Sequence, residues 1–213
     1  MMRSWMRRLL GMTSALILTA VGFPLCLSAA DPEGEETDDL LAVSDAPDYL
    51  EYLAAHSGTA RPSGRIVLTA ADISGEQDSH RLTGYLGYEW EAVCTEEGGY
   101  VEYTFVAEQA GFYTISADFC VPDGRHTAAE RDILVNGTLP YSEAAGVTFK
   151  RRWVNSSPIG QDTNGNDIRP VQQEEEGWQT RFLTDAMGYH ASPLTFYFEQ
   201  GSNTLRFSAV REP

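Results

Sequence analysis

The chain has 213 residues and a hydrophobic fraction of 42%, which is ordinary for a globular protein and argues against disorder. Its 15 Lys and Arg residues against 31 Asp and Glu residues give a net charge of −16. That charge excludes nucleic-acid binding through a basic face, and it argues against docking on an anionic membrane surface.

Residues 1–30 have the pattern of a secretory signal peptide. Three arginines precede an apolar run over residues 9–27, and small residues at positions 28 and 30 suit cleavage before Asp31. We therefore expect a secreted, extracellular or cell-surface protein. A retained membrane anchor is the alternative. A lipid anchor at Cys26 is not favoured, because the small residue usual before a lipidated cysteine is missing.

Residues 31–60 are expected to form an acidic linker followed by one short helix. The linker, DPEGEETDDLLAVSDA, has few large apolar residues and is typical of a solvated spacer. In PDYLEYLAAHS, Ser44 or Asp45 is the expected cap. Leu50, Leu53 and Ala54 are expected to form the buried stripe.

Residues 61–213 are predicted to form an antiparallel β-sandwich, because apolar residues alternate with period two and turn residues recur about every ten positions. Matching apolar faces predicts a hairpin between residues 101–105 and 113–119. A strand over 133–135 should end at the turn Asn136-Gly137, and residues 194–198 should pair with 205–209. The fold class is therefore all-β, with a jelly-roll or galactose-binding-like sandwich and one N-terminal helix.

Export would leave Cys94 and Cys120 in an oxidising compartment, where a pair can form a disulfide. If Cys94 lies on a strand that forms a hairpin with residues 100–106, one strand separates the two cysteines. Two strand spacings are roughly 9 to 10 Å, which exceeds the Cα separation of a disulfide. We therefore expect the bond to be absent unless a segment bends into the other sheet.

Catalytic motifs are not evident. The four histidines lack metal-ligand spacing, and no nucleophile elbow or phosphate-binding glycine loop occurs. Asp132 and Glu174 are candidates for paired carboxylates only because the chain is acidic, and solvated or ion-paired surface acids are the favoured explanation. The sequence therefore favours a protein that is not an enzyme.

A long segment over residues 140–180 interrupts the alternation, and loops of this length are often functional. It concentrates the residue types that grip sugars, because aromatic rings stack on sugar faces while polar side chains bond hydroxyls. The candidate ligand-binding residues are Arg151, Arg152, Trp153, Asn166, Asp167, Arg169 and Trp178. The alternative is structural: the tryptophans fill the core and Arg169 ties the loop to an acid.

The run DTNGND within this segment resembles oxygen-rich calcium loops, and the candidate ligands are Asp162, Asn164 and Asp167, with Asn166 close by. Its fit to a helix-loop-helix calcium loop is poor, since the glycine comes early and no Glu occupies the twelfth position. Plain turn chemistry explains the Asn and Gly residues equally well. Calcium is therefore the one cofactor that the sequence suggests.

Several motifs resemble those of a known family. These are AGFYTISADF, ERDILVNG, PYSEAAGVTFKRRW, QDTNGNDIRPVQQEEEGWQT and EQGSNTLRFSAVREP. Together they resemble the N-terminal β-sandwich of large extracellular solute-binding proteins, components of carbohydrate ABC transporters in Gram-positive bacteria. More loosely, the chain is similar to galactose-binding-like folds and to carbohydrate-binding modules of families 6 and 35. The strand that reads A-E-D in those modules here carries Ala70, Ala71 and Asp72.

In the transporter family the chain would continue with another strand and two α/β lobes, so the resemblance implies that residues 61–213 lack a closing strand and leave a sheet edge exposed. It also implies a secreted, non-catalytic carbohydrate-binding or accessory module, with a glycan or oligosaccharide, transporter proteins or cell-surface proteins as partners. The alternatives are a structural or protein-interaction domain without a sugar ligand, and a fragment of a glycoside hydrolase.

Overall fold

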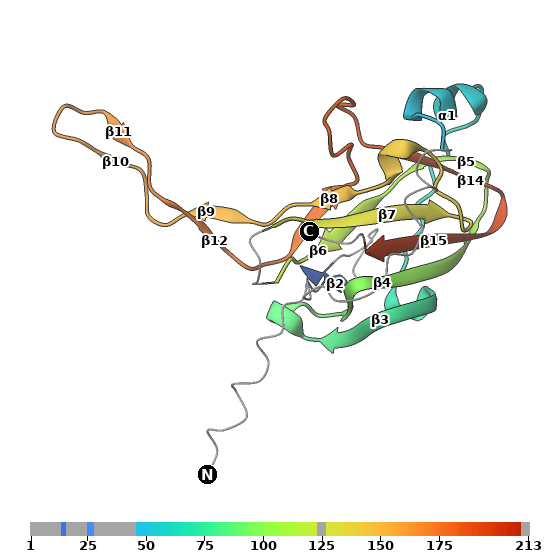
Figure 1. The fold of residues 1–213 in the computed structure, drawn as a ribbon, viewed down its shortest axis with the longest axis horizontal. Coiled ribbons are helices and arrows are strands. Elements are labelled where there is room, and N and C mark those ends of the chain that lie inside the picture. Colours follow the sequence, from blue (N-terminus) through green and yellow to red (C-terminus); the bar gives the residue numbers. More distant parts are fainter. Residues whose placement is uncertain (1–13, 16–24, 28–45, 123–126, 210–213) are drawn as a thin grey trace, which may run out of the picture.

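The computed structural model describes residues 14–15, 25–27, 46–122 and 127–209, and shows a mostly antiparallel β-sandwich with one α-helix (Figure 1). The predicted fold class is confirmed. The strand order of the large sheet is β13-β6-β2-β1-β4-β15-β7-β8, with β3 also paired to β4. None of the helices in these ranges has the length and apolar character needed to cross a membrane.

Nine strands make up the large sheet, and their bounds are β1 Ser14–Ala15, β2 Leu25–Leu27, β3 Ile73–Thr83, β4 Glu91–Ala107, β6 Ser116–Phe119, β7 Ala129–Val135, β8 Val147–Phe149, β13 Gln179–Phe182 and β15 Gly201–Ala209. All pairings in this sheet are antiparallel except those of β2 with β4 and with β6. The helix α1 spans Tyr49–Ala55, and three short 3₁₀ turns are η2 Ala70–Asp72, η3 Tyr85–Gly87 and η4 Ser142–Ala144.

The second layer is a two-stranded sheet of β5 (Gly111–Thr114) and β14 (Thr195–Phe198). Aromatic rings join the layers: Phe105 on β4 meets Phe198 on β14 edge to face, with ring centroids 5.0 Å apart. The core of described residues runs in sequence from Tyr49 to Phe207. Edge-to-face contacts of this kind add to the stabilisation from burying apolar area, so they fix how the layers face each other.

Two predicted hairpins are wrong. Tyr113 on β5 pairs with Phe196 on β14, whereas Phe105 on β4 pairs with Asn203 on β15. The chain therefore crosses between the layers after β4, and again between β14 and β15. Alternation cannot distinguish a hairpin from such a crossing, because both keep the same apolar side chains in the core. The strand before Asn136-Gly137 is confirmed as β7, with Asn136 at a φ of 51° in the turn.

The segment TEEG, expected to be a hairpin turn before residues 100–106, lies inside one 17-residue strand, β4. Its register against β3 shifts between Gln77 and Ser79, which is a β-bulge. A Cβ on Gly99 would lie 2.6 Å from the carbonyl oxygen of Asp78, so only glycine allows this close approach. A bulge therefore takes the place of the expected turn.

The helix α1 begins one turn later than expected. Asp48 is the cap, and its Oδ1 accepts a hydrogen bond from the Glu51 N–H at 2.8 Å. The helix buries Tyr49 and Tyr52, whereas Leu50 is 63% exposed. The expected stripe is therefore wrong for Leu50 and Ala54, while Leu53 is partly buried against the core. The two tyrosines dock the helix, because their hydroxyls also find partners on β14.

Most of the predicted signal peptide and acidic linker lie outside the described residues. Within residues 1–45 the structure describes only the backbone pairings of β1 and β2. Cleavage before Asp31, the lipid anchor at Cys26 and the spacer over 31–45 therefore stay predictions.

Candidate functional site

The long segment after β8 is an arm rather than an irregular loop. Its base is the pairing of β9 (Trp153–Asn155) with β12 (Gln172–Glu174), and its end is the pairing of β10 (Gly160–Gln161) with β11 (Asp167–Ile168). Figure 1 shows the arm extending away from the sandwich, and the chain returns from it into β13. Most side chains along the arm are exposed.

The turn at the tip of the arm is closed by one carboxylate. Asp162 Oδ1 accepts hydrogen bonds from the backbone N–H groups of Asn164 at 2.8 Å and Asn166 at 2.9 Å, and Oδ2 accepts from Asn166 Nδ2 at 2.9 Å. The Asn166 side chain and backbone hold the pKa of Asp162 below its usual value. Asp167 accepts from Gln161 Nε2 at 3.2 Å.

The predicted calcium ligands are thus arranged as a turn around Asp162. The Asp162 carboxylate already accepts three hydrogen bonds from within residues 162–166, so a cation would have to compete with these N–H groups for its oxygens. Among the described residues, no group of three His, Cys, Asp or Glu side chains gathers to hold a metal.

At the base of the arm, the two neighbouring arginines differ in role. Arg151 is buried and ion-paired with Glu174, and it donates to the carbonyl oxygens of Thr127 at 2.6 Å and Pro122 at 2.7 Å. It therefore ties the arm to the sandwich instead of facing a ligand. Arg152 is half exposed and forms an ion pair with Glu175 at 2.9 Å.

The two candidate tryptophans also differ. Trp153 lies on β9 and is 49% exposed. Trp178 is partly buried, packs on Cys94 and Cys120, and donates its Nε1–H to the Tyr85 carbonyl at 2.9 Å. Trp178 therefore packs inside the protein and also keeps part of its ring accessible. Its position fits neither the sugar-binding alternative alone nor the core-packing alternative alone.

Cys94 and Cys120 share one buried cluster, and both are free thiols with no disulfide between them. Burial raises the pKa of the Cys120 thiol to about 12, which keeps it protonated and unreactive. The hairpin at TEEG does not form, but β2 pairs with both β4 and β6, so one strand does lie between the strands that carry or precede the two cysteines.

Three rings and three polar side chains form what we call the aromatic shelf, and its members are Tyr85, Tyr88, Asp118, Glu176, Trp178 and Thr180. The Trp178 ring centroid lies 4.7 Å from that of Tyr88 and 6.1 Å from that of Tyr85. The segment GYLGYEW places both tyrosines on and directly after η3, beside β13.

The polar side chains of the shelf are held by the tyrosines. The Tyr88 hydroxyl donates to Asp118 Oδ2 at 3.0 Å, while Tyr85 donates to Glu176 and Thr180 donates to Asp118. Asp118 points outward because its strand β6 buries the alternate residues, Ala117 and Phe119. Burial, followed by the charge of Asp118, raises the pKa of Tyr88 well above its usual value.

Sequence reasoning found Trp178 but missed the rest of the shelf. The available signal was the pair of tyrosines in GYLGYEW, whose density of aromatic residues is unusual for a connection between strands. Of the other predicted ligand residues, Asn166, Asp167 and Arg169 lie on the exposed outer part of the arm.

The two candidate catalytic acids have structural partners. Asp132 accepts a hydrogen bond from the Gly146 N–H at 2.8 Å, and Glu174 pairs with Arg151. These contacts give each carboxylate a structural role that involves no catalysis.

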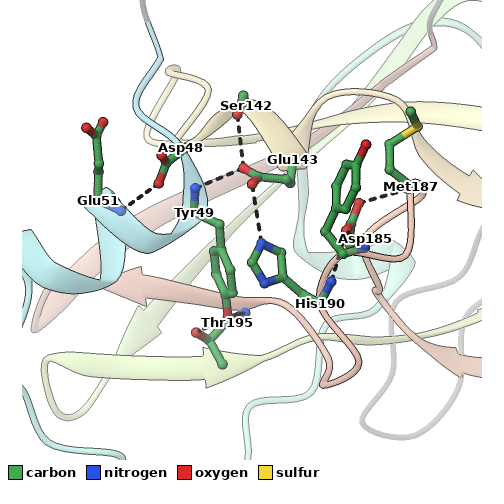
Figure 2. Close-up of polar contacts among 10 residues, drawn as sticks. Asp48, Tyr49, Glu51, Ser142, Glu143, Asp185, Met187, His190 and Thr195 are labelled. Carbon is green, nitrogen blue, oxygen red and sulfur yellow. Dashed lines mark hydrogen bonds and ion pairs between the residues drawn. The ribbon is translucent and has the colours of Figure 1, made fainter.

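A second polar cluster fixes the helix to the sandwich (Figure 2). Glu143 on η4 accepts a hydrogen bond from the Tyr49 N–H at 2.9 Å, and its other oxygen lies 3.4 Å from His190 Nε2. Asp185 accepts from three backbone N–H groups, those of Met187, Tyr189 and His190. The cluster joins α1, η4 and the loop after β13, so its geometry explains docking of the helix.

Comparisons with known proteins assign no family. No protein-family model matches the chain, and no curated protein matches it. One solved structure, a family 35 carbohydrate-binding module from Clostridium thermocellum, is similar at 18% identity with a TM-score of 0.39. The match covers 68% of this chain and 85% of that chain. At these values the likeness transfers neither a ligand nor a site.

Proposed function

We propose that this protein is a non-catalytic carbohydrate-binding module whose glycan lies on the aromatic shelf. The observation that carries the proposal is the placement of the Trp178 and Tyr88 rings beside the carboxylates of Asp118 and Glu176. Aromatic faces pack on the apolar faces of sugar rings, and carboxylates accept hydrogen bonds from sugar hydroxyls.

Each carboxylate of the shelf keeps acceptor capacity for a ligand. A carboxylate has about four lone-pair sites. The hydrogen bonds from Tyr88 and Thr180 use one site on each oxygen of Asp118, and Glu176 accepts one from Tyr85. The tyrosine hydroxyls therefore orient these acids without exhausting them, which is how a preorganised polar site is built.

The test is isothermal titration of the protein against a panel of soluble oligosaccharides, with Glu176→Gln as the first variant. Glu176 is exposed, so the change should leave the fold intact. Loss of a charged acceptor should weaken the best ligand by about tenfold or more. Glu108→Gln, an exposed acid on the connection after β4, is the matched control and should bind as the unchanged protein does.

The proposal fails if no oligosaccharide binds to folded protein, or if Glu176→Gln and Glu108→Gln bind equally well. Trp178→Phe supplies a second check, because phenylalanine retains packing while losing the indole N–H and part of the ring face. Circular dichroism shows whether each variant keeps its fold.

The finer part of the proposal is that the module is secreted and serves sugar uptake at the cell surface. The export pattern of residues 1–30 and the resemblance of the quoted motifs to solute-binding proteins support it. N-terminal sequencing of protein recovered from the culture medium and the wall fraction tests it. A chain that keeps residues 1–30 in the cytoplasm would contradict it.

A second candidate function is protein binding through the arm, which exposes the apolar side chains of Trp153, Ile159, Ile168 and Val171. Replacing residues 157–170 by a two-residue Asn-Gly turn should keep the β9–β12 pairing and the shelf. Unchanged glycan binding by this shortened chain would favour the shelf, whereas loss of glycan binding would show that the sugar needs the arm.

A further inference from the structure

A cavity of about 430 Å³ opens between the two layers of the sandwich, apart from the aromatic shelf. The large sheet contributes Phe105 and Leu205, and the small sheet contributes Phe112 and Phe198. All four side chains are less than 10% exposed in the chain as a whole. The volume is within the range of sites that hold one small molecule.

The segment over residues 61–68 forms one wall of the cavity. Its start is fixed to β5, because the Phe112 N–H donates to the Ala60 carbonyl at 3.2 Å. A Cβ on Gly111 would lie 2.5 Å from that same oxygen, so the segment approaches β5 as closely as glycine permits. The wall is therefore built by the fold.

Two arginines, Arg61 and Arg65, lie in this wall and are exposed. None of the described residues that line the cavity is an Asp or a Glu. Within residues 46–122 and 127–209, no ion pair joins either arginine to an acid, whereas Arg81, Arg151 and Arg206 each have an acidic partner. Two uncompensated cations at one opening are notable in a chain with a net charge of −16.

We infer that this cavity binds a small amphipathic carboxylate, with its apolar body among the phenylalanines and its carboxylate at Arg61 and Arg65. The phenylalanine and leucine side chains favour contact with an aliphatic body, and the polar part of the lining comes from the two arginines and from Thr114, Ser116 and Thr195. Guanidinium groups bind carboxylates through charge-assisted hydrogen bonds. The site differs from the aromatic shelf in its residues and in its ligand.

The test is isothermal titration of the full chain with decanoate and with the uncharged decanol below their aggregation limits. Decanoate should bind once per chain and about tenfold more tightly than decanol, since two exposed charge contacts together contribute about 1.4 kcal/mol. Arg61→Gln with Arg65→Gln should remove that tenfold preference and leave decanol binding unchanged. Arg169→Gln on the arm is the matched control and should keep the preference.

Phe182, which is 55% exposed and lines the cavity, tests the apolar half of the site. Phe182→Ala should weaken decanoate and decanol alike, because both lose the same contact area. Equal binding of the two ligands to the unchanged protein, or no binding, would overturn the inference. Arginine-dependent binding to vesicles of phosphatidylcholine and phosphatidylglycerol without binding of free decanoate would overturn it too, in favour of a lipid surface. Titrating the variant with both Arg61→Gln and Arg65→Gln against glycans distinguishes failure of this inference from failure of the proposed function. Glycan binding on the aromatic shelf should not depend on these two arginines.

Discussion

Asn203 controls the crossing between β14 and β15. Its side chain is 1% exposed, accepts a hydrogen bond from the Glu199 N–H at 3.1 Å, and donates to the carbonyls of Glu199 and Gly201. It also accepts from Asn136 Nδ2, which links the crossing to the turn after β7. One buried amide thus replaces the ladder bonds that a simple hairpin would have supplied.

We expect Asn203→Ala to lower the free energy of unfolding by about 1 to 3 kcal/mol, because the partly buried N–H and carbonyl of Glu199, the carbonyl of Gly201 and the Asn136 side chain lose their common partner. Urea denaturation monitored by circular dichroism measures the change. Asn164→Ala at the exposed tip of the arm is the control and should change stability by less than about 0.5 kcal/mol. Equal effects of the two substitutions would contradict the role given to Asn203.

Asp185 makes stability depend on pH. Burial acts to raise its pKa, but the N–H groups of Met187, His190 and Tyr189 outweigh burial, and the pKa lies below its usual value. A carboxyl with a lower pKa in the folded state contributes stability above its unfolded pKa, and loses it as the pH falls through the folded pKa. Acid should therefore loosen the loop that carries His190.

We expect Asp185→Asn to be less stable than the unchanged protein at neutral pH, and the difference should shrink as the pH falls below about 4. Urea midpoints measured from about pH 7 to about pH 2.5 test this. A constant difference over the whole range would show that the Asp185 charge does not contribute.

At the scale of elements, close backbone approach decides where strands continue. Gly99 allows the bulge of β4 to lie against Asp78 on β3, and Gly111 allows β5 to lie against the segment that begins at Ala60. Both glycines occur in stretches that look like ordinary turns in the sequence. A glycine of this kind can end a strand, or it can let the strand continue close beside another segment. Which of the two occurs depends on the position of the neighbouring backbone, and the local sequence does not specify that position.

We expect Gly99→Ala to destabilise the protein by about 1 to 3 kcal/mol, because its Cβ would lie 2.6 Å from a backbone oxygen and β3 or β4 would have to shift. Gly64→Ala is the control, since nothing lies within 4 Å of a Cβ there. Thermal melts of both variants distinguish them, and a Gly99→Ala protein as stable as Gly64→Ala would contradict the close approach.

The whole molecule shows how far sequence reasoning reaches. Period-two alternation correctly predicted the all-β fold class and the strand β7 with its turn. Burial of alternate side chains repeats along a strand regardless of which strand it pairs with. Which strands pair with each other could not be predicted, since the inner faces of both layers are apolar. Trp178 was found as an aromatic residue in a polar segment. Asp118 joins it through the pairing of β6 with β13, and Tyr85 joins it because η3 lies against Trp178.

The core also bears on the expected cleavage before Asp31. Because the core of described residues begins at Tyr49, a chain that starts at Asp31 should unfold cooperatively, with a melting temperature within a few degrees of that of the full chain. Differential scanning calorimetry of both chains tests this. Loss of cooperative unfolding would show that the pairings of β1 and β2 with β4 are needed.

The irregular pairing of β3 with β4 has a consequence for solubility. Among the described residues β3 pairs only with β4, so its other side is a sheet edge. Its register shifts twice, and Asp78 has a φ of 44° beside charged neighbours such as Arg81 and Glu76. An incoming strand could not form a regular ladder along such an edge. A second molecule should therefore not extend the sheet at the β3 edge when the protein is concentrated.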